Sequence, residues 1–392
     1  MILFSIILML SINDVAAQQK SICSFKWTIG QTLPAENGRE KSLGFAGAIN
    51  GISNDVLIVA GGANFPNGMP WEGGKKFYSN KIYVLQKDGD KFFWNENIKD
   101  TLPEAVAYCG STSTDAGIFY GGGENENGIS DKAFLLNWNT DKNKIDITQL
   151  PHLPLALTNI SATSIGNVVY TAGGDQEKNS SGKFFKIDLN KRNPQWESLP
   201  DLPIALANAT AIVQNGNDGI NIYVIGGRSK TTTGVSDLHN TVYAFNPAKQ
   251  EWKKCAEVSD GKNTNNLSAA AGVTFGKNKI LIIGGDNGNV FHQIESHISK
   301  ISKATIAGER DKLTGEKNDL IIDHKGFDRS LLLYNTISDV WTKVGEYPYP
   351  AQVTTNAVKW GDDIIISNGE IKPGVRTPNL IIGKETGCKE KE

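Results

Sequence analysis

The stretch VLIVAGG (residues 56–62) is the first of six short apolar strands that end in Gly-Gly or Asn-Gly. The others are GIFYGGG (117–123), VVYTAGG (168–174), NIYVIGG (221–227), KILIIGG (279–285) and DIIISNG (363–369). A run of small residues precedes each copy, and a second apolar strand follows it. Most copies then carry a strand with a tryptophan, so the repeating unit contains four strands.

This repeat has a period of about 50–60 residues, which is the length of one blade of a β-propeller. The glycine pair followed by a tryptophan is the kelch pattern. Glycines let the backbone turn sharply out of the strand without a Cβ clash. A β-sandwich with coincidental glycine pairs is the alternative, but six copies in register favour an all-β, six-bladed kelch-type propeller.

Composition agrees with a globular β protein. The 392 residues include 41 glycines and 39% hydrophobic residues, and the formal net charge is −2. A chain without excess positive charge is a poor partner for nucleic acid. Beyond the N-terminus, no apolar run approaches the roughly 18 residues of a membrane-spanning helix, so we expect no membrane span.

The N-terminus reads as an export signal. Residues 2–12 (ILFSIILMLSI) form an apolar core that is too short to cross a bilayer, and Val15-Ala16-Ala17 offers a small-residue cleavage site. We therefore expect a signal peptide over residues 1–17, a single domain over residues 18–392, and a periplasmic location. A buried N-terminal strand or helix is the structural alternative.

Strand counting predicts how the propeller closes. The sixth unit ends one strand short, while FKWTIGQTLP (residues 25–34) stands unassigned at the other end with the tryptophan of a final strand. We expect it to complete the last blade antiparallel to residues 378–384. That pairing would bring Cys23 beside Cys388, and we predict a disulfide between them. Cys109 and Cys255 fall in different blades and should stay buried and unpaired.

The residues directly after each glycine pair are the candidates for chemistry. Blade symmetry places all six around one mouth of the central channel, where loops on a rigid scaffold carry function. These post-glycine positions hold Ala63, Glu124, Asp175, Arg228, Asp286 and Glu370. Several carboxylates and an arginine in one ring suit acid–base chemistry on a small polar anion. For a single residue such as Asp175 or Asp286, a loop cap or a surface ion pair is the simpler interpretation. It is less favoured for Glu370, because the loop of Glu370 departs from the repeat.

Three loops should shape this mouth. In NGEIKPGVRT (residues 368–377), the Pro-Gly turn should hold Glu370 near Arg376, a residue suited to binding carboxylates. The long loop 63–79 offers Asn64. The insertion 286–329, in the fifth unit, offers Asn287 and apolar residues at helical spacing from Phe291 to Ala304. That helix could pack on the propeller rim or act as a lid.

The same residues carry a family resemblance. NGEIKPGVRT, GFAGAINGISNDVLIVAGGANF (44–65) and GGDNGNVF (284–291) resemble kelch-type N-acetylneuraminate epimerases, also called sialic acid mutarotases. The similarity spans nearly the whole mature chain in rotated order, as in the cyclically permuted mutarotase group. The resemblance implies a periplasmic isomerase acting on a free sugar acid, with Glu370 as proton acceptor and Arg376 at the substrate.

On that resemblance, mutarotation opens and recloses the sugar ring, which requires a base and an acid but no cofactor. Glu124 is the candidate for the acid, and Arg228 for a second cationic contact. The five histidines show no metal-binding spacing, so we expect no metal site. A sialidase-like hydrolase is one alternative, although Ser113–Gly117 gives a single Asp-box-like string and reads as a hairpin turn. A non-catalytic kelch module that binds carbohydrate or protein is another.

Overall fold

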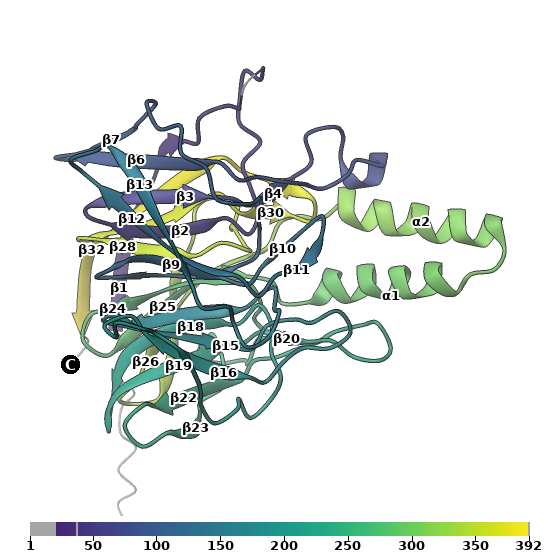
Figure 1. The fold of residues 1–392 in the computed structure, drawn as a ribbon. Coiled ribbons are helices and arrows are strands. Elements are labelled where there is room, and N and C mark those ends of the chain that lie inside the picture. The colour runs from purple at the N-terminus through teal and green to yellow at the C-terminus, as the bar shows by residue number, and fades with distance from the viewer. Residues whose placement is uncertain (1–20, 37, 391–392) are drawn as a thin grey trace, which may run out of the picture.

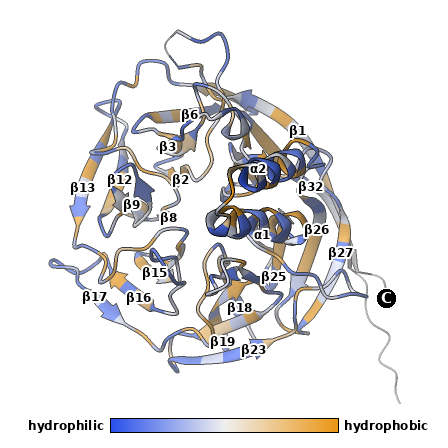
Figure 2. Ribbon diagram, turned by 90° about the vertical axis from the view of Figure 1, so that its right-hand side faces the viewer, coloured by the Kyte–Doolittle hydropathy of each residue, from blue (hydrophilic) through white to orange (hydrophobic). Residues whose placement is uncertain are grey.

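A computed structural model describes residues 21–36 and 38–390. Within this part of the chain, six four-stranded antiparallel sheets surround a central axis (Figures 1 and 2). The predicted six-bladed propeller is confirmed. The predicted signal peptide, residues 1–17, lies outside the described residues. No helix in the described part is long and apolar enough to cross a membrane.

The blades, numbered 1 to 6 along the chain, share one strand order from the axis outward. The innermost strands are β2 (Ile49–Ser53), β8 (Gly110–Thr114), β14 (Ser161–Ile165), β18 (Thr210–Gly216), β24 (Ala271–Phe275) and β28 (Ala357–Trp360). The second strands, which end at the glycine pairs, are β3 (Val56–Ala60), β9 (Gly117–Gly121), β15 (Val168–Ala172), β19 (Gly219–Ile225), β25 (Lys279–Gly285) and β29 (Asp363–Ser367). The third strands are β6 (Ile82–Asp88), β12 (Ala133–Asn139), β16 (Phe184–Asp188), β22 (Val242–Asn246), β26 (Asp328–Asn335) and β32 (Asn379–Glu390). The outermost strands are β7 (Lys91–Trp94), β13 (Lys144–Leu150), β17 (Trp196–Ser198), β23 (Glu251–Cys255), β27 (Val340–Glu346) and β1 (Ser21–Thr32).

The smaller elements gather on one face, which we call the mouth face (Figure 1). Two-stranded hairpins follow the glycine pairs of blades 1, 2, 4 and 6, namely β4–β5 (Ala63–Asn64, Phe77–Tyr78), β10–β11 (Glu124–Asn125, Gly128–Ile129), β20–β21 (Arg228–Ser229, Asp237–Leu238) and β30–β31 (Glu370–Lys372, Val375–Arg376). A 3-10 helix, η1 (Pro70–Glu72), lies between β4 and β5. In blade 5, helices α1 (Asn289–Lys303) and α2 (Ala307–Ile322) replace the hairpin and project from this face.

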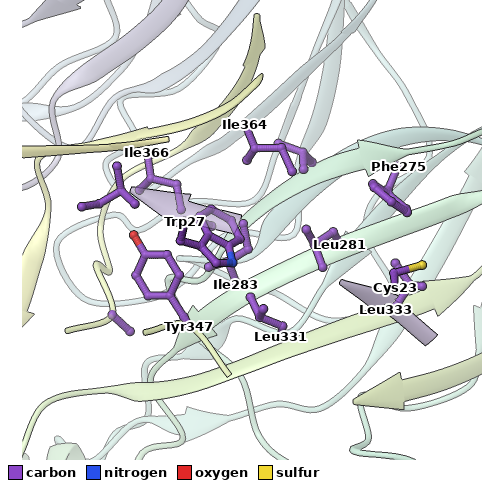
Figure 3. Packing of buried hydrophobic residues seen from close by; sticks show 14 residues of the cluster. Cys23, Trp27, Phe275, Leu281, Ile283, Leu331, Leu333, Tyr347, Ile364 and Ile366 are labelled. Atoms are coloured by element: carbon purple, nitrogen blue, oxygen red, sulfur yellow. The ribbon is translucent and has the colours of Figure 1, made fainter. Parts of the chain in front are cut away.

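The N-terminal strand closes the propeller as predicted. Strand β1 pairs antiparallel with β32, and Cys23 lies opposite Cys388 in that register. The two cysteines form a disulfide, which confirms the expected bond. Trp27 of β1 packs edge-on against Tyr347, with ring centroids 5.0 Å apart, in the core between blades 5 and 6 (Figure 3). Both chain ends thus stabilise the same blade.

The glycine pairs are required because neighbouring backbone comes too close to leave room for a Cβ atom. Gly61 has a φ of +63°, and a Cβ there would stand 2.5 Å from the Val106 carbonyl oxygen of the next inter-blade loop. In the sixth copy Asn368 takes this place with a φ of +59°. Asparagine tolerates the left-handed region better than most residues. Its side-chain oxygen also accepts a hydrogen bond from the Phe45 N–H at 3.3 Å.

A closed ring of backbone hydrogen bonds narrows the channel at the mouth face. Six residues with φ between +53° and +64°, one from each blade entry, form this mouth ring: Gly47, Tyr108, Asn159, Asn208, Ala269 and Thr354. The N–H of each donates to the carbonyl of the ring residue in the blade before it, at 2.7–3.3 Å, and Gly47 closes the circle on Thr354. The residue preceding each ring member bridges to a post-glycine position. The mouth ring therefore fixes all six candidate positions relative to one another.

Candidate functional site

The predicted pair Glu370 and Arg376 meets in the β30–β31 hairpin. The two residues are register partners, and the Arg376 Nη1 lies 3.0 Å from the Glu370 Oε1. The turn glycine, Gly374, donates its N–H to the same oxygen at 2.6 Å. Gly374 has a φ of +82°, so the Pro-Gly turn creates this geometry. No hydrogen bond from a described residue reaches Oε2, which leaves one carboxylate oxygen of Glu370 open.

The guanidinium of Arg376 is held in place on several sides. Its Nε donates to the Ala63 carbonyl at 3.3 Å, and its Nη2 lies 3.4 Å from the Tyr108 hydroxyl. The ring of Phe65 stacks under it with its centroid 4.7 Å away. The side chain is only 5% exposed. A planar cation fixed this way is preorganised for binding a carboxylate.

A second cation, Lys76, lies beside Arg376. Its Nζ stands 5.0 Å from the centroid of the Tyr108 ring and 3.2 Å from the Glu124 Oε1. Burial alone would lower the pKa of Lys76. The electrostatic effects of Tyr108, Glu124 and Tyr78, which face it, outweigh burial and raise that pKa. Lys76 therefore stays charged. No repeat position predicts Lys76, because it comes from the long loop 63–79.

Glu124 belongs to this Lys76 cluster. Its Oε1 accepts hydrogen bonds from the Tyr78 hydroxyl at 2.8 Å and from Lys76. Burial, assisted by the bond to Glu124, raises the pKa of Tyr78 to about 12. Tyr78 is thus a neutral donor at ordinary pH. Both donors reach the same oxygen of Glu124, so Lys76 and Tyr78 hold this side chain in place.

Arg228, expected as a second cationic contact, lies in a different ion pair. Its Nη2 stands 2.6 Å from the Asp175 Oδ2. The Asp175 side chain is 1% exposed and also accepts a hydrogen bond from Ser180 at 2.8 Å. The pair links blades 3 and 4, and both carboxylate oxygens of Asp175 are engaged within the protein. The structure therefore separates Arg228 from the Glu370–Arg376 pair.

Asp286 and His324 border the same mouth from the blade 5 insertion. Burial raises the pKa of Asp286, and the nearby Glu370 raises it further. Burial and Lys372 lower the pKa of His324, against the opposing effect of Glu370. Both residues line a cavity of about 610 Å³ between the helical hairpin and blade 5, within the size range of ligand sites. A second space, of about 320 Å³, is the central channel itself, lined mostly by small and polar residues.

The two predicted asparagines differ in placement. Asn64 is buried, and its amide nitrogen donates to the Gly44 carbonyl at 3.1 Å. Asn287 is exposed, lines the cavity, and accepts a hydrogen bond from the Asn289 N–H at 3.0 Å. Only Asn287 is therefore placed to contact a ligand in the cavity without a rearrangement.

The loops predicted to shape the mouth enclose the β30–β31 hairpin. The η1 segment contacts the turn on one side, where a Cβ on Gly374 would stand 3.1 Å from Pro70. On the other side Lys372 donates to the Ile322 carbonyl at the end of α2, at 3.3 Å. The predicted helix is α1. Its Glu295 carboxylate accepts a hydrogen bond of 2.6 Å from the Ser236 N–H of the β20–β21 hairpin. The helices stand over the mouth rather than along the rim (Figure 2).

Fold and site together define a six-bladed kelch-type propeller with a carboxylate–arginine hairpin at the mouth of its channel. A model of the family described as "NANM: N-acetylneuraminate epimerase" matches residues 10–145 and 150–389. The chain belongs to this family.

Individual relatives agree with this assignment. A protein of Haemophilus influenzae (strain 86-028NP) named "N-acetylneuraminate epimerase" is 28% identical over 239 residues, which cover 60% of this chain and 59% of the relative. One of the same name from Salmonella typhimurium (strain LT2) is 27% identical over 59% of this chain and 57% of its own length. The chain thus aligns with less than two thirds of these relatives. The solved "Structure of YjhT" shares the fold, with a TM-score of 0.61, 15% identity, and coverage of 93% of this chain and 100% of its own.

Proposed function

We propose that this protein is a mutarotase that interconverts the anomers of free N-acetylneuraminate. The observation that carries the proposal is the Glu370–Arg376 pair, at 3.0 Å, in the β30–β31 hairpin of the mouth face. Membership in the N-acetylneuraminate epimerase family supports the choice of substrate. A base and an anion-binding cation in one hairpin are what a sugar acid requires.

Arg376 binds the carboxylate of the sugar acid. A guanidinium has five N–H groups, and three of its nitrogens each give one to Ala63, Glu370 or Tyr108. The remaining N–H groups can hold a carboxylate in a forked contact. Lys76, 5.0 Å from the centroid of the Tyr108 ring, adds positive potential to the site.

Glu370 acts as the base. Arg376 and Gly374 both donate to Oε1, so Oε2 accepts the proton of the anomeric hydroxyl. As that proton leaves, the bond between the anomeric carbon and the ring oxygen breaks, and its electron pair goes to the ring oxygen, which takes up a proton. The open-chain ketone rotates and the ring closes on its other face. Glu370 then returns its proton to the anomeric oxygen, so no proton is consumed.

Anomer exchange measured by proton NMR tests the proposal. One anomer of free N-acetylneuraminate is generated in situ, and its conversion is followed with and without protein. Faster equilibration supports the proposal. Unchanged equilibration with measurable sugar binding indicates a non-catalytic module, and release of sugar from a sialoside indicates a hydrolase; either result rejects the proposal.

We infer that the mature protein works in the periplasm. The apolar stretch at residues 2–12 precedes a small-residue cleavage site. The Cys23–Cys388 disulfide suits an oxidising compartment. Expression with the native N-terminus followed by cell fractionation tests this, together with N-terminal sequencing. A periplasmic product beginning at Gln18 is expected, and an uncleaved cytoplasmic product would reject the inference.

A further inference from the structure

We propose that Asp286 is the second catalytic group of this site, the one that gives a proton to the ring oxygen as the sugar opens and recovers it on closure. The proposal rests on the mutarotase function and names the residue which that reaction still lacks. It assigns this role to Asp286 in place of Glu124, whose Oε1 accepts hydrogen bonds from Lys76 and Tyr78.

The mouth ring places Asp286 next to Glu370. Glu370 bridges to Val353, and Asp286 bridges to Ser268, each through paired backbone hydrogen bonds of 2.9 Å. The residues that follow these partners, Thr354 and Ala269, are joined by a ring hydrogen bond of 3.3 Å. The two carboxyl groups therefore occupy equivalent positions on adjacent blades. Since the ring fixes the backbone, their relation does not depend on a mobile loop.

Asp286 differs from the other acidic post-glycine positions in having no cation. Glu124 pairs with Lys76, Asp175 with Arg228, and Glu370 with Arg376. Among the described residues, Asp286 forms no ion pair. Its Oδ1 accepts the Gly288 N–H at 2.8 Å, which leaves Oδ2 for a ligand.

The surroundings of Asp286 favour a protonated carboxyl. Burial raises its pKa, and the Gly288 hydrogen bond only partly opposes this. The titratable and charged groups that face it or share its cavity come from the β30–β31 hairpin, from α1, from α2 and from the segment after α2. They are Glu370, His292, Glu295, His297, Glu316, Asp319, Asp323, His324 and Lys325. Carboxylates outnumber cations in this set, so the local field disfavours a further negative charge.

These properties complete the proton balance. Glu370 Oε2 takes the anomeric proton while Asp286 gives its own to the ring oxygen. Two acidic groups in different environments, one beside an arginine and one without a cation, are the usual way in which a site obtains a base and an acid from carboxyls. On ring closure both transfers run in reverse.

Substitution of Asp286 by asparagine tests the role. Asp286→Asn preserves the acceptor for the Gly288 N–H but removes the proton. We expect kcat to fall by about 100- to 10,000-fold with little change in KM, and the alkaline limb of the pH–rate profile to disappear. Asp237→Asn makes the same change at an exposed carboxylate of the β20–β21 hairpin and should keep the wild-type rate and profile.

A direct titration tests, without an activity measurement, whether the charge of Glu370 affects the pKa of Asp286. The Asp286 carboxyl carbon is followed by carbon-13 NMR against pH in the wild type and in Glu370→Gln. The Asp286 pKa should fall in the variant, because the neighbouring negative charge is gone. An active wild type combined with an unchanged rate in Asp286→Asn, or with an Asp286 pKa indifferent to Glu370→Gln, overturns this inference alone. An inactive wild type rejects the mutarotase proposal instead.

Discussion

Two carboxylate–arginine pairs lie at the mouth of this propeller, and they differ in what surrounds them. Asp175 and Arg228 join blades 3 and 4 at 2.6 Å, and the Asp175 side chain is 1% exposed. Glu370 and Arg376 join the two strands of one hairpin at 3.0 Å, and the Glu370 side chain is 16% exposed. Two acidic post-glycine residues, each paired with an arginine, thus form one closed pair and one open pair.

The difference lies in unused hydrogen-bonding capacity. Both Asp175 oxygens are engaged: Oδ1 accepts from Ser180, while Oδ2 accepts from Arg228 and lies 3.4 Å from the Asn159 amide. Both donors to Glu370 reach a single oxygen. A buried carboxylate with both oxygens engaged holds its neighbours in place, whereas a carboxylate with a free oxygen can exchange protons with a ligand. A post-glycine position therefore does not by itself identify a functional residue.

The largest effect should come from removing the base. Glu370→Gln should slow anomer exchange by about 100- to 10,000-fold, because the amide keeps the shape of the hairpin but cannot accept the anomeric proton. Sugar binding, measured by calorimetry, should persist. Proton NMR of the anomers checks the rate, and a variant as fast as the wild type would remove Glu370 from the mechanism.

The matched change in the closed pair should affect stability instead. Asp175→Asn leaves Arg228 without its counter-charge in a nearly buried place, and loss of one partner of such a pair costs about 3–5 kcal/mol. Denaturant unfolding measures this cost. The rate per folded molecule should match the wild type. If Asp175→Asn instead slowed exchange while remaining as stable as the wild type, the assignment of structural and functional pairs would be reversed.

Most of the features that could be predicted from the sequence follow from its repeat. Six copies of one strand pattern determine the blade count, and the missing strand after residue 384 determines the closure and the disulfide. Glu370 and Arg376 were predictable because a Pro-Gly turn brings residues six apart together. Lys76 and Tyr108 were not, since Lys76 comes from a long loop outside the repeat. Tyr108 occupies a mouth-ring position, with a φ of +60°, at which the blades carry side chains of different kinds or none.

The closed and open pairs also looked alike in sequence. Asp175 and Arg228 follow consecutive glycine pairs, and nothing in those strings shows that the two side chains meet across the blade boundary. The second helix, α2, was missed as well. Its sequence, AGERDKLTGEKNDLII, is mostly polar, and only Ile321 within it is buried, so it lacks the apolar periodicity that predicts a helix.

The disulfide tests whether the open pair depends on how its blade is closed. Cys388 follows Asn379 by nine residues of β32, so it lies roughly 30 Å from the hairpin. The double change Cys23→Ser and Cys388→Ser should lower the free energy of unfolding by roughly 2–5 kcal/mol and leave the rate per folded molecule unchanged. Reduced and oxidised wild type serve as controls. A slower rate at full folding would show that closure of blade 6 positions Glu370.

The smallest of these effects concerns the arginine of the open pair. Arg376→Lys keeps the charge but loses the fork that reaches Ala63, Glu370 and Tyr108 together. We expect KM for the sugar acid to rise by about 10- to 100-fold, the equivalent of one or two charge-assisted hydrogen bonds, with a smaller fall in kcat. Arg192→Lys, at an exposed position, is the control. If kcat fell and KM did not change, Arg376 would act on Glu370 rather than on the substrate, and the open pair would serve proton transfer alone.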